Sequence, residues 1–382
     1  MQRLFAFVLA AASTVSALAQ APQPPEIAAR SYLLVDLSAN QVLAERDADT
    51  PSDPASLTKL MTAYIVFDAL KQKRLSLDQP LTISVRAWDE RKGEPSLMFI
   101  DTTMRPKVDE LLRGMIIQSG NDAAVALAEG VGGTVEQFVA MMNRQAQAWG
   151  LKNTQFSNVT GQTEPGHKSS ARDLSVIATR IIKDFPEFYP YYAQREYTYN
   201  KIRQQSRNLL LARDPSVDGM TAGYTDGAGY SLIASAQRDF PNGKRRLLSV
   251  VMGTASKEAR ANESQKLLNW GYSTFDAVRL FEGGQAVSTV KVWKGAVPEA
   301  KLGAEGPVYV AVPRGEGAKL QTQVERTDPL VAPLGKGQRV GTLKVSTTAG
   351  VPVAEVPLVV QEAVPLAGIF GRAWDAIRLW IK

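Results

Sequence analysis

A serine and a lysine three positions apart are the residues of this chain best suited to covalent chemistry. Ser56-Leu57-Thr58-Lys59 follows Pro54, and apolar residues continue at helical spacing, which predicts that a helix begins near Ser56. Positions i and i+3 share a helix face, so the Lys59 amine can reach the Ser56 hydroxyl. A hydroxyl nucleophile needs an adjacent base, and a desolvated lysine can serve at neutral pH. The spacing predicts this chemistry, although the motif alone also fits a capping serine and a solvated lysine.

A second polar segment places a hydroxyl and an amide in one turn. Ser119-Gly120-Asn121 joins two apolar helical patterns, 111–117 and 123–129. Such a turn can hold both side chains at one point of a site. Ser, Gly and Asn are also ordinary residues of helix ends, so a capping role stays open.

A third segment, 217–225 (VDGMTAGYT), precedes a strand-like run at 230–235. Ser-x-x-Lys, Ser-x-Asn and Lys-Thr-Gly, in this order, are motifs of penicillin-binding proteins and class A β-lactamases. From about Ser31 onward the chain resembles the periplasmic D-alanyl-D-alanine carboxypeptidases, which are serine-type, low-molecular-mass penicillin-binding proteins. Further matching segments are 96–99 (SLMF), 150–154 (GLKNT), 169–173 (SSARD), 202–204 (IRQ) and 228–230 (AGY).

The resemblance implies acyl transfer on peptidoglycan stem peptides. Ser56 would attack the carbonyl between two D-Ala residues, Lys59 would act as its base, and Ser119 would pass a proton to the leaving amine. Asn121 would orient the substrate and Lys59. Main-chain N–H groups, here those of Ser56 and Tyr224, would form the oxyanion hole. β-Lactams would form covalent adducts with the same serine.

The third motif departs from the family pattern. Thr221-Ala222-Gly223 replaces Lys-Thr-Gly, and Tyr224 stands where His is common. In the family that Lys and Thr hold the carboxylate of the peptide or of a β-lactam. This chain lacks both, although Thr221 keeps a hydroxyl one position earlier.

Two arginines match basic residues near the family's site. Arg260 is the candidate for residual carboxylate binding, and a surface ion pair is the alternative role for Arg203 and for Arg260. The residues expected to bind substrate are Asn121, Thr221, Gly223, Tyr224, Arg203 and Arg260.

Two classes of function therefore remain. The first is an active D-Ala-D-Ala carboxypeptidase, and the second is a weakened or non-catalytic peptidoglycan-binding or cell-shape protein on the same fold. A β-lactamase is a weaker third hypothesis. Apart from the motifs of the carboxypeptidase family, the sequence shows no recognisable carboxylate that would activate water for deacylation. Labelling by a fluorescent penicillin separates the first two.

Composition excludes several other classes. With one histidine and no cysteine, the chain cannot build a zinc site of the His/Cys type, and we expect neither a metal nor a cofactor. His167 lies in a polar loop, which predicts an exposed histidine without a catalytic role. No P-loop or dinucleotide fingerprint is present. The net charge of +6 is dispersed, so nucleic acid is not implied and a mild attraction to anionic lipid fits better.

The order of the predicted elements indicates an α+β fold. Strands at 31–37 and 41–46 precede helices at 57–70, 108–117, 123–129, 134–149 and 171–183, and strands return at 195–199, 230–237 and 246–252 before a helix at 258–274. Terminal strands around a helical block predict one sheet packed by helices. The resemblance implies the same: a β-lactamase/penicillin-binding-protein-like domain, 26–282, with an antiparallel sheet flanked by helices.

The remaining segments predict export and attachment. Residues 1–19 have the pattern of a signal peptide. Residues 283–362 alternate in short runs with Gly and Pro turns, which predicts a small all-β domain. Residues 363–382 form an amphipathic helix with two tryptophans opposite basic residues, typical of an interfacial anchor, although docking on the protein's own sheet is the alternative. We expect a periplasmic protein attached peripherally to the outer face of the inner membrane.

Overall fold

The computed structural model of the protein describes residues 22–92, 96–241 and 243–380. The predicted signal peptide lies outside these residues. A five-stranded antiparallel sheet forms the centre of the larger domain, in the order β2-β1-β7-β6-β5. Its strands are β1 (Ser31–Asp36), β2 (Gln41–Arg46), β5 (Val217–Thr225), β6 (Gly229–Phe240) and β7 (Gly243–Thr254). The first strand thus pairs with one that lies more than 200 residues later in the chain.

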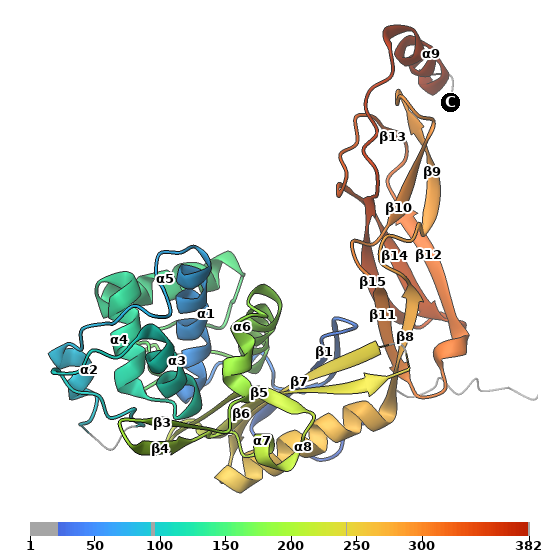
Figure 1. Ribbon diagram of the computed structural model, residues 1–382. Helices are drawn as coiled ribbons and strands as arrows, with labels where there is room; N and C mark the ends of the chain where they lie inside the picture. The colour runs from blue at the N-terminus through green and yellow to red at the C-terminus, as the bar shows by residue number, and fades with distance from the viewer. Residues whose placement is uncertain (1–21, 93–95, 242, 381–382) are drawn as a thin grey trace, which may run out of the picture.

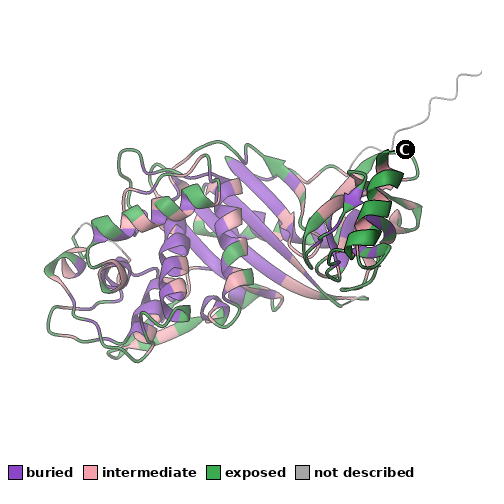
Figure 2. Cartoon of the chain, turned by 90° about the horizontal axis from the view of Figure 1, so that it is seen from above, coloured by how far each residue is buried: buried purple, intermediate pink, exposed green. Residues whose placement is uncertain are grey.

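Both faces of this sheet are covered by helices. Successive side chains of a strand point to opposite faces, so Leu248 and Val250 of β7 pack into the helical cluster. Leu247 and Val251 pack on the other side, against α8 (Lys257–Thr274). Figure 2 accordingly shows the strands as largely buried.

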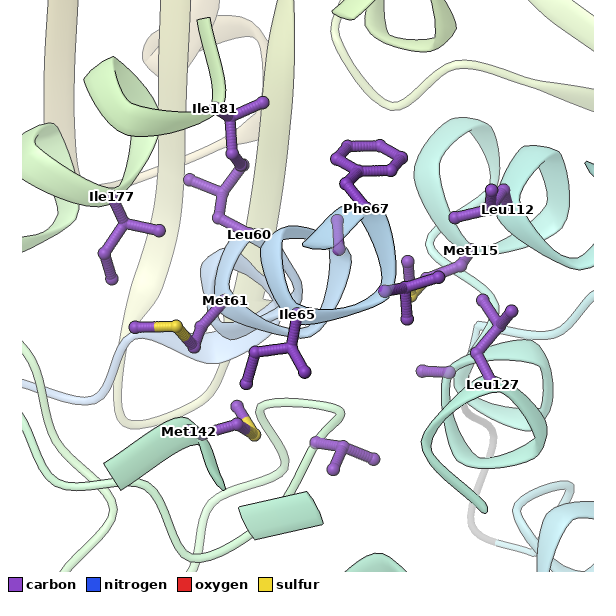
Figure 3. Close-up of a cluster of buried hydrophobic side chains, with 14 of the residues drawn as sticks. Leu60, Met61, Ile65, Phe67, Leu112, Met115, Leu127, Met142, Ile177 and Ile181 are labelled. Carbon is purple, nitrogen blue, oxygen red and sulfur yellow. The ribbon is translucent and has the colours of Figure 1, made fainter. Parts of the chain in front are cut away.

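The helical cluster is built around α1 (Lys59–Lys71), which continues a short 3-10 helix, η1 (Ala55–Thr58). Around it lie α2 (Val85–Asp89), α3 (Val108–Ile117), α4 (Asn121–Gly132), α5 (Val135–Ala148) and α6 (Ala171–Asp184). Figure 3 shows Leu60, Ile65 and Phe67 of α1 among side chains of the surrounding helices. A helix that is apolar on most of its circumference must be buried, so α1 is a rigid base for the residues at its N-terminus.

Shorter elements connect the helical cluster to β5. They are η2 (Tyr189–Ala193), the hairpin of β3 (Glu196–Tyr199) and β4 (Ile202–Gln205), and α7 (Leu210–Arg213).

A second, all-β region extends away from the larger domain as an arm (Figure 1). β8 (Phe275–Phe281) pairs with β11 (Val308–Pro313), followed by η3 (Gly317–Lys319). A six-stranded sheet in the order β12-β14-β15-β10-β9-β13 contains β9 (Ser288–Trp293), β10 (Glu299–Gly303), β12 (Leu320–Arg326), β13 (Leu330–Val331), β14 (Arg339–Thr347) and β15 (Pro352–Val360). The final helix, α9 (Ile369–Trp380), lies at the far end of the arm. Within the described residues, no helix combines the length and apolarity needed to cross a membrane.

The expected α+β class is confirmed, with an all-β region and a terminal helix after it. The sequence pattern did not predict β5, β8 or β10 as strands. For β5 the reason is composition: its run contains two glycines, an aspartate and an alanine, which are poor strand formers outside a sheet that already exists.

Candidate active site

A pocket of about 420 Å³ lies between the edge strand β5 and the helical cluster. Segments far apart in the chain line it: η1, the turn between α3 and α4, the loop 160–162, β5 and the start of α8. The lining residues are Ser56, Ser96, Ser119, Asn121, Thr160, Gly161, Gln162, Arg207, Ala222, Gly223, Tyr224, Thr225, Tyr230, Lys257 and Arg260.

Ser56 and Lys59 meet at the base of this pocket. In a 3-10 turn the side chains at i and i+3 eclipse, and Lys59 Nζ lies 3.1 Å from Ser56 Oγ. The Lys59 side chain is buried, and it donates hydrogen bonds to Asn121 Oδ1 at 2.7 Å and to the Thr160 carbonyl at 2.6 Å. Burial lowers the pKa of Lys59 to about 7.

These contacts orient the Lys59 amine. An amide oxygen and a carbonyl oxygen can only accept hydrogen bonds, so each must receive an N–H from Nζ. A neutral amine has two N–H bonds and one lone pair. The lone pair is then left facing the Ser56 hydroxyl, which is the arrangement of a general base and its nucleophile.

The turn between α3 and α4 adds a hydroxyl and an amide. Ser119 has φ of 65°, a left-handed conformation that a non-glycine residue holds only where its surroundings impose it. Its Oγ is buried and has no hydrogen-bond partner among the described residues, although Ser119 lines the pocket. Asn121 begins α4, and its backbone N–H donates to the Ser96 carbonyl at 2.8 Å. The Ser119 hydroxyl is therefore free to bond to a bound molecule.

The strand wall of the pocket approaches the nucleophile closely at Gly223. A Cβ added there would lie 2.9 Å from Ser56 N and 3.0 Å from Ala55 Cβ, so only glycine fits without movement. Thr221 is buried and does not line the pocket. Tyr224 is exposed, stacks on Tyr230 with ring centroids 4.2 Å apart, and donates its hydroxyl proton to an Asp226 oxygen at 2.6 Å.

Three cations line the pocket, and no carboxylate does so among the described residues. Arg260 donates to the Gly223 carbonyl at 3.0 Å and to the Arg207 carbonyl at 3.1 Å. Burial, and then the charge of Arg207, lower the pKa of Arg260 to about 10. Burial also lowers the pKa of Arg207. A buried Arg260 and a half-buried Arg207 beside Lys257 prepare this end of the pocket for an anion.

Arg203 does not reach this site. It is exposed on the β3–β4 hairpin and forms an ion pair with Glu196. Strand alternation explains the difference, because Gln204 takes the buried side and Arg203 the exposed one. In this part of the chain the arginine that lines the pocket is Arg207, which donates to the Gln118 carbonyl at 3.3 Å and to Ser96 Oγ. Sequence spacing alone offered no signal that favoured it.

The prediction of an exposed His167 was wrong. Its ring is buried beside η1, with Nε2 2.8 Å from Thr58 Oγ1, and Nδ1 accepts a hydrogen bond from Ser157 N at 3.0 Å. Burial lowers its pKa. Because Nδ1 accepts, the proton of the neutral ring lies on Nε2. His167 thus supports the segment that carries Ser56 and is not among the pocket-lining residues.

Asp53 joins three parts of the site, and its role was missed in the sequence. Its carboxylate accepts hydrogen bonds from Ala55 N at 2.8 Å, Thr163 Oγ1 at 2.6 Å and Thr225 Oγ1 at 2.8 Å. The nucleophile segment, the loop after Gly161 and strand β5 are therefore held together by one side chain.

Comparison with known proteins agrees with this geometry. The D-alanyl-D-alanine carboxypeptidase family, peptidase S11, matches residues 18–256, and the penicillin-binding protein 5 C-terminal domain matches 275–366. The chain is 42% identical to the D-alanyl-D-alanine carboxypeptidase DacC of Escherichia coli K12, over 98% of this chain and 94% of that protein. It is 40% identical to DacA of Haemophilus influenzae, over 99% and 96%.

Solved structures agree as well. Penicillin binding protein 5 from Haemophilus influenzae superposes with a TM-score of 0.83 at 40% identity, over 90% of this chain and 99% of that one. Penicillin binding protein 6B from Escherichia coli gives 0.72 at 38% identity, over 89% and 98%. With a matched catalytic domain, a matched C-terminal domain and the serine–lysine pair in place, the chain belongs to the D-alanyl-D-alanine carboxypeptidase family.

Proposed function

We propose that this chain is a serine-type D-Ala-D-Ala carboxypeptidase that removes the terminal D-Ala from peptidoglycan stem peptides. The observation that carries the proposal is the Lys59 amine, whose two N–H bonds are taken by Asn121 and Thr160 so that its lone pair faces Ser56. A lysine with a pKa of about 7 is about half neutral at pH 7 and can accept the hydroxyl proton.

The reaction then proceeds in two steps. Ser56 Oγ attacks the carbonyl carbon of the penultimate D-Ala while its proton passes to Lys59, and backbone N–H groups of Ser56 and Tyr224 stabilise the oxyanion. The proton moves through the Ser119 hydroxyl to the leaving amine, and free D-Ala departs. Water then attacks the ester on Ser56 and releases the shortened peptide. A β-lactam acylates the same oxygen through its ring carbonyl.

The substrate carboxylate binds at the cationic end of the pocket, which is lined by Arg207, Lys257 and Arg260. Thr221 cannot supply a cation, so the terminal carboxylate of the peptide is held by Arg260, with Arg207 and Lys257 beside it. Asn121, Gly223 and Tyr224 contact the peptide backbone. Arg203 has no part in this arrangement.

The direct test is covalent labelling of the full chain. Incubation with a β-lactam should add one molecule to the peptide that contains Ser56, and the adduct should be absent in Ser56→Ala. Incubation with a peptide ending in D-Ala-D-Ala should release D-Ala. An adduct on Ser119 would overturn the assignment of the nucleophile, and a protein inert in both assays would be a non-catalytic member of the family.

We further propose that the chain is exported with 1–19 as its signal peptide. A catalytic domain over 26–282, an all-β domain over 283–362 and an anchor over 363–382 would attach it to the outer face of the inner membrane. The orientation of α9 supports the anchor. Its polar side meets the arm, where Asp375 accepts a hydrogen bond from Lys294 N at 2.7 Å. Its apolar side is exposed, with Phe370 93% and Trp380 89% accessible. A helix docked by its polar side leaves the apolar side for lipid.

Vesicle flotation tests the anchor. The protein should float with vesicles that contain phosphatidylglycerol. Deletion of 368–382, which spares the buried Val364 of the arm, and Phe370→Ser with Trp374→Ser should both abolish flotation without lowering the melting temperature. Val351→Ser, which changes an exposed apolar residue of the same arm, is the matched control and should float normally. Flotation of the truncated protein would exclude this anchor.

A further inference from the structure

The peptide group that leads into the nucleophile has a constrained backbone. Ala55 directly precedes Ser56, is fully buried and has φ of 48°. A left-handed conformation is unfavourable for a residue with a Cβ, so it persists only where neighbouring contacts impose it. The contacts that impose it also fix the direction of the Ser56 N–H, because Ala55 C=O and Ser56 N–H belong to one planar peptide group.

Two glycines contact this peptide group from opposite sides. A Cβ added at Gly161 would overlap Ala55 O, whereas one added at Gly223 would lie 2.9 Å from Ser56 N. The C=O and N–H of a trans peptide point in opposite directions, so the loop that carries Gly161 and strand β5 lie on either side of it. The distance between this loop and β5 therefore decides where the Ser56 N–H lies.

One carboxylate fixes the loop, the strand and the turn between them. Asp53 Oδ1 accepts a hydrogen bond from Ala55 N at 2.8 Å. Asp53 Oδ2 accepts from Thr163 Oγ1 at 2.6 Å and from Thr225 Oγ1 at 2.8 Å. Each threonine follows the glycine of its own segment by two positions. Hydrogen bonds to a charged acceptor are stronger than neutral ones, so Asp53 ties the three segments firmly at one point.

The tie to β5 matters because β5 is an edge strand. In the sheet order β2-β1-β7-β6-β5 it is the last strand and pairs with β6. At Gly223 this strand contacts the nucleophile segment, and the N–H of the next residue, Tyr224, is the second donor of the expected oxyanion hole. Two donors act together only if both lie within hydrogen-bond distance of the oxyanion, so a small displacement of β5 would separate them.

We propose that Asp53 is a positioning residue for the oxyanion hole. Its carboxylate imposes the left-handed turn at Ala55 and holds β5 and the Gly161 loop against that turn. The N–H groups of Ser56 and Tyr224 then converge on one point. Asp53 is not among the pocket-lining residues, so it acts through these groups and not by contact with the substrate. The proposal rests on the acyl-transfer function proposed above.

The first experiment compares Asp53→Ala with Asp239→Ala, which removes an exposed carboxylate of β6 outside the pocket. Stopped-flow kinetics with a fluorescent penicillin separates the dissociation constant of the initial complex from the acylation rate constant. For Asp53→Ala we expect the rate constant to fall by at least about tenfold, because loss of one oxyanion donor costs about 10²–10³-fold. The dissociation constant should change by less than about twofold, because the cationic end of the pocket is untouched. Asp239→Ala should change neither quantity. An unchanged rate constant, or a loss confined to binding, would overturn the proposal.

A second background separates positioning from general destabilisation. Glycine adopts a positive φ readily, so Ala55→Gly makes the turn less dependent on Asp53. In the Asp53→Ala background, Ala55→Gly should raise the rate constant several-fold, and by more than it does in the otherwise unchanged protein. Lys73→Gly also replaces a residue of positive φ, 59°, but lies after α1, so it is the matched control and should give no such gain. Equal gains from the two glycines, or no gain from either, would contradict the role assigned to Asp53.

Amide hydrogen exchange tests the tie without turnover. In Asp53→Ala, exchange should become faster in peptides that cover 158–165 and 221–227, whereas the β3–β4 hairpin should keep its original rate. If the unchanged protein is not acylated but both segments still exchange faster in the variant, the proposed function fails and the tie stands. Unchanged exchange in either segment refutes the tie.

Discussion

The two walls of the pocket differ in how completely they are built. On the helix wall, Lys59 has partners for both N–H bonds and is oriented towards Ser56. On the strand wall, Thr221-Ala222 stands where the family carries Lys-Thr, and Thr221 does not line the pocket. At Gly223 the strand wall requires a glycine, because a Cβ there would lie 2.9 Å from Ser56 N.

The difference shows that the groups proposed for catalysis and the groups expected to bind the substrate carboxylate lie on different walls and can change independently. The side chains that we propose to break and form bonds meet in the pocket, whereas the cation that would anchor the substrate carboxylate has to come from outside β5. Arg260 of α8 can supply this cation, since it is buried, lines the pocket and binds the Gly223 carbonyl of β5. We therefore expect a competent nucleophile and base combined with an altered site for the substrate carboxylate.

The largest effect should come from the helix wall. Ser56→Ala or Lys59→Met should lower β-lactam acylation by about a thousandfold or more, because nucleophile and base act as a unit. Stopped-flow kinetics with a fluorescent penicillin measures this rate. Ser273→Ala, at an exposed serine outside the pocket, should react normally. Appreciable acylation of Lys59→Met would mean that another base serves Ser56.

The next largest effect should be a gain in activity when the missing Lys and Thr are restored on the strand wall. Thr221 shares with Gly223 the strand face that abuts Ser56, so a longer side chain at 221 extends towards the site. Thr221→Lys with Ala222→Thr adds a charge-assisted hydrogen bond worth about 1.5–3 kcal/mol. We expect kcat/KM for D-Ala release to rise by about 10- to 150-fold, with β-lactam acylation in parallel. If the rate is unchanged, the cations already present hold the carboxylate fully.

Removal of Arg260 should have a smaller effect on the rate, because Arg207 and Lys257 remain in the pocket. Arg260→Ala should lower kcat/KM for D-Ala release by about tenfold. Arg203→Ala removes an arginine that lies outside the pocket and should leave the rate unchanged, which makes it the matched control. Equal losses in the two variants would contradict the assignment of the carboxylate to the cationic end.

The smallest effect concerns pH. Lys59 must be neutral to accept a proton, and its pKa of about 7 lies below the ordinary value, so the acylation rate rises with pH through this region. Between pH 8 and pH 6.5 the neutral fraction, and with it the rate, should fall about fourfold. Arg260 keeps its charge up to a pKa of about 10, so binding should weaken only above that pH. A rate that is flat from pH 6 to 8 would exclude Lys59 as the titrating base.

The helices of the catalytic domain and the serine–lysine pair were predictable because their information is local. Ser56 and Lys59 are neighbours in any helical turn, so their meeting needs no distant contact. The helical periodicity of 57–70 predicted α1 well, apart from its 3-10 start. The family resemblance supplied Ser119, Asn121 and Arg260, which the structure brings to the same pocket.

Other features depend on contacts that no local pattern contains. Arg203 lies on the exposed side of β4, whereas Arg207 lies after that strand and packs against Gln118 and Ser96. Spacing along the chain could not rank the two arginines, because these contacts come from distant segments. The polar flanks of His167 predicted exposure, yet packing against Thr58 buries it. Residues 217–225 are a strand because β6 and η1 lie beside them, not because their composition favours one.

By itself, the sequence determined the chemical groups, their helical spacing and the family, since these depend on residue identity and on periodicity along one segment. Only the tertiary structure decided which way the Lys59 amine points. That orientation requires an amide 62 residues away and a carbonyl 101 residues away to occupy its two N–H bonds. The burial that lowers the pKa of Lys59 is likewise a property of the packed helices, because desolvation exists only once other segments exclude water from the amine.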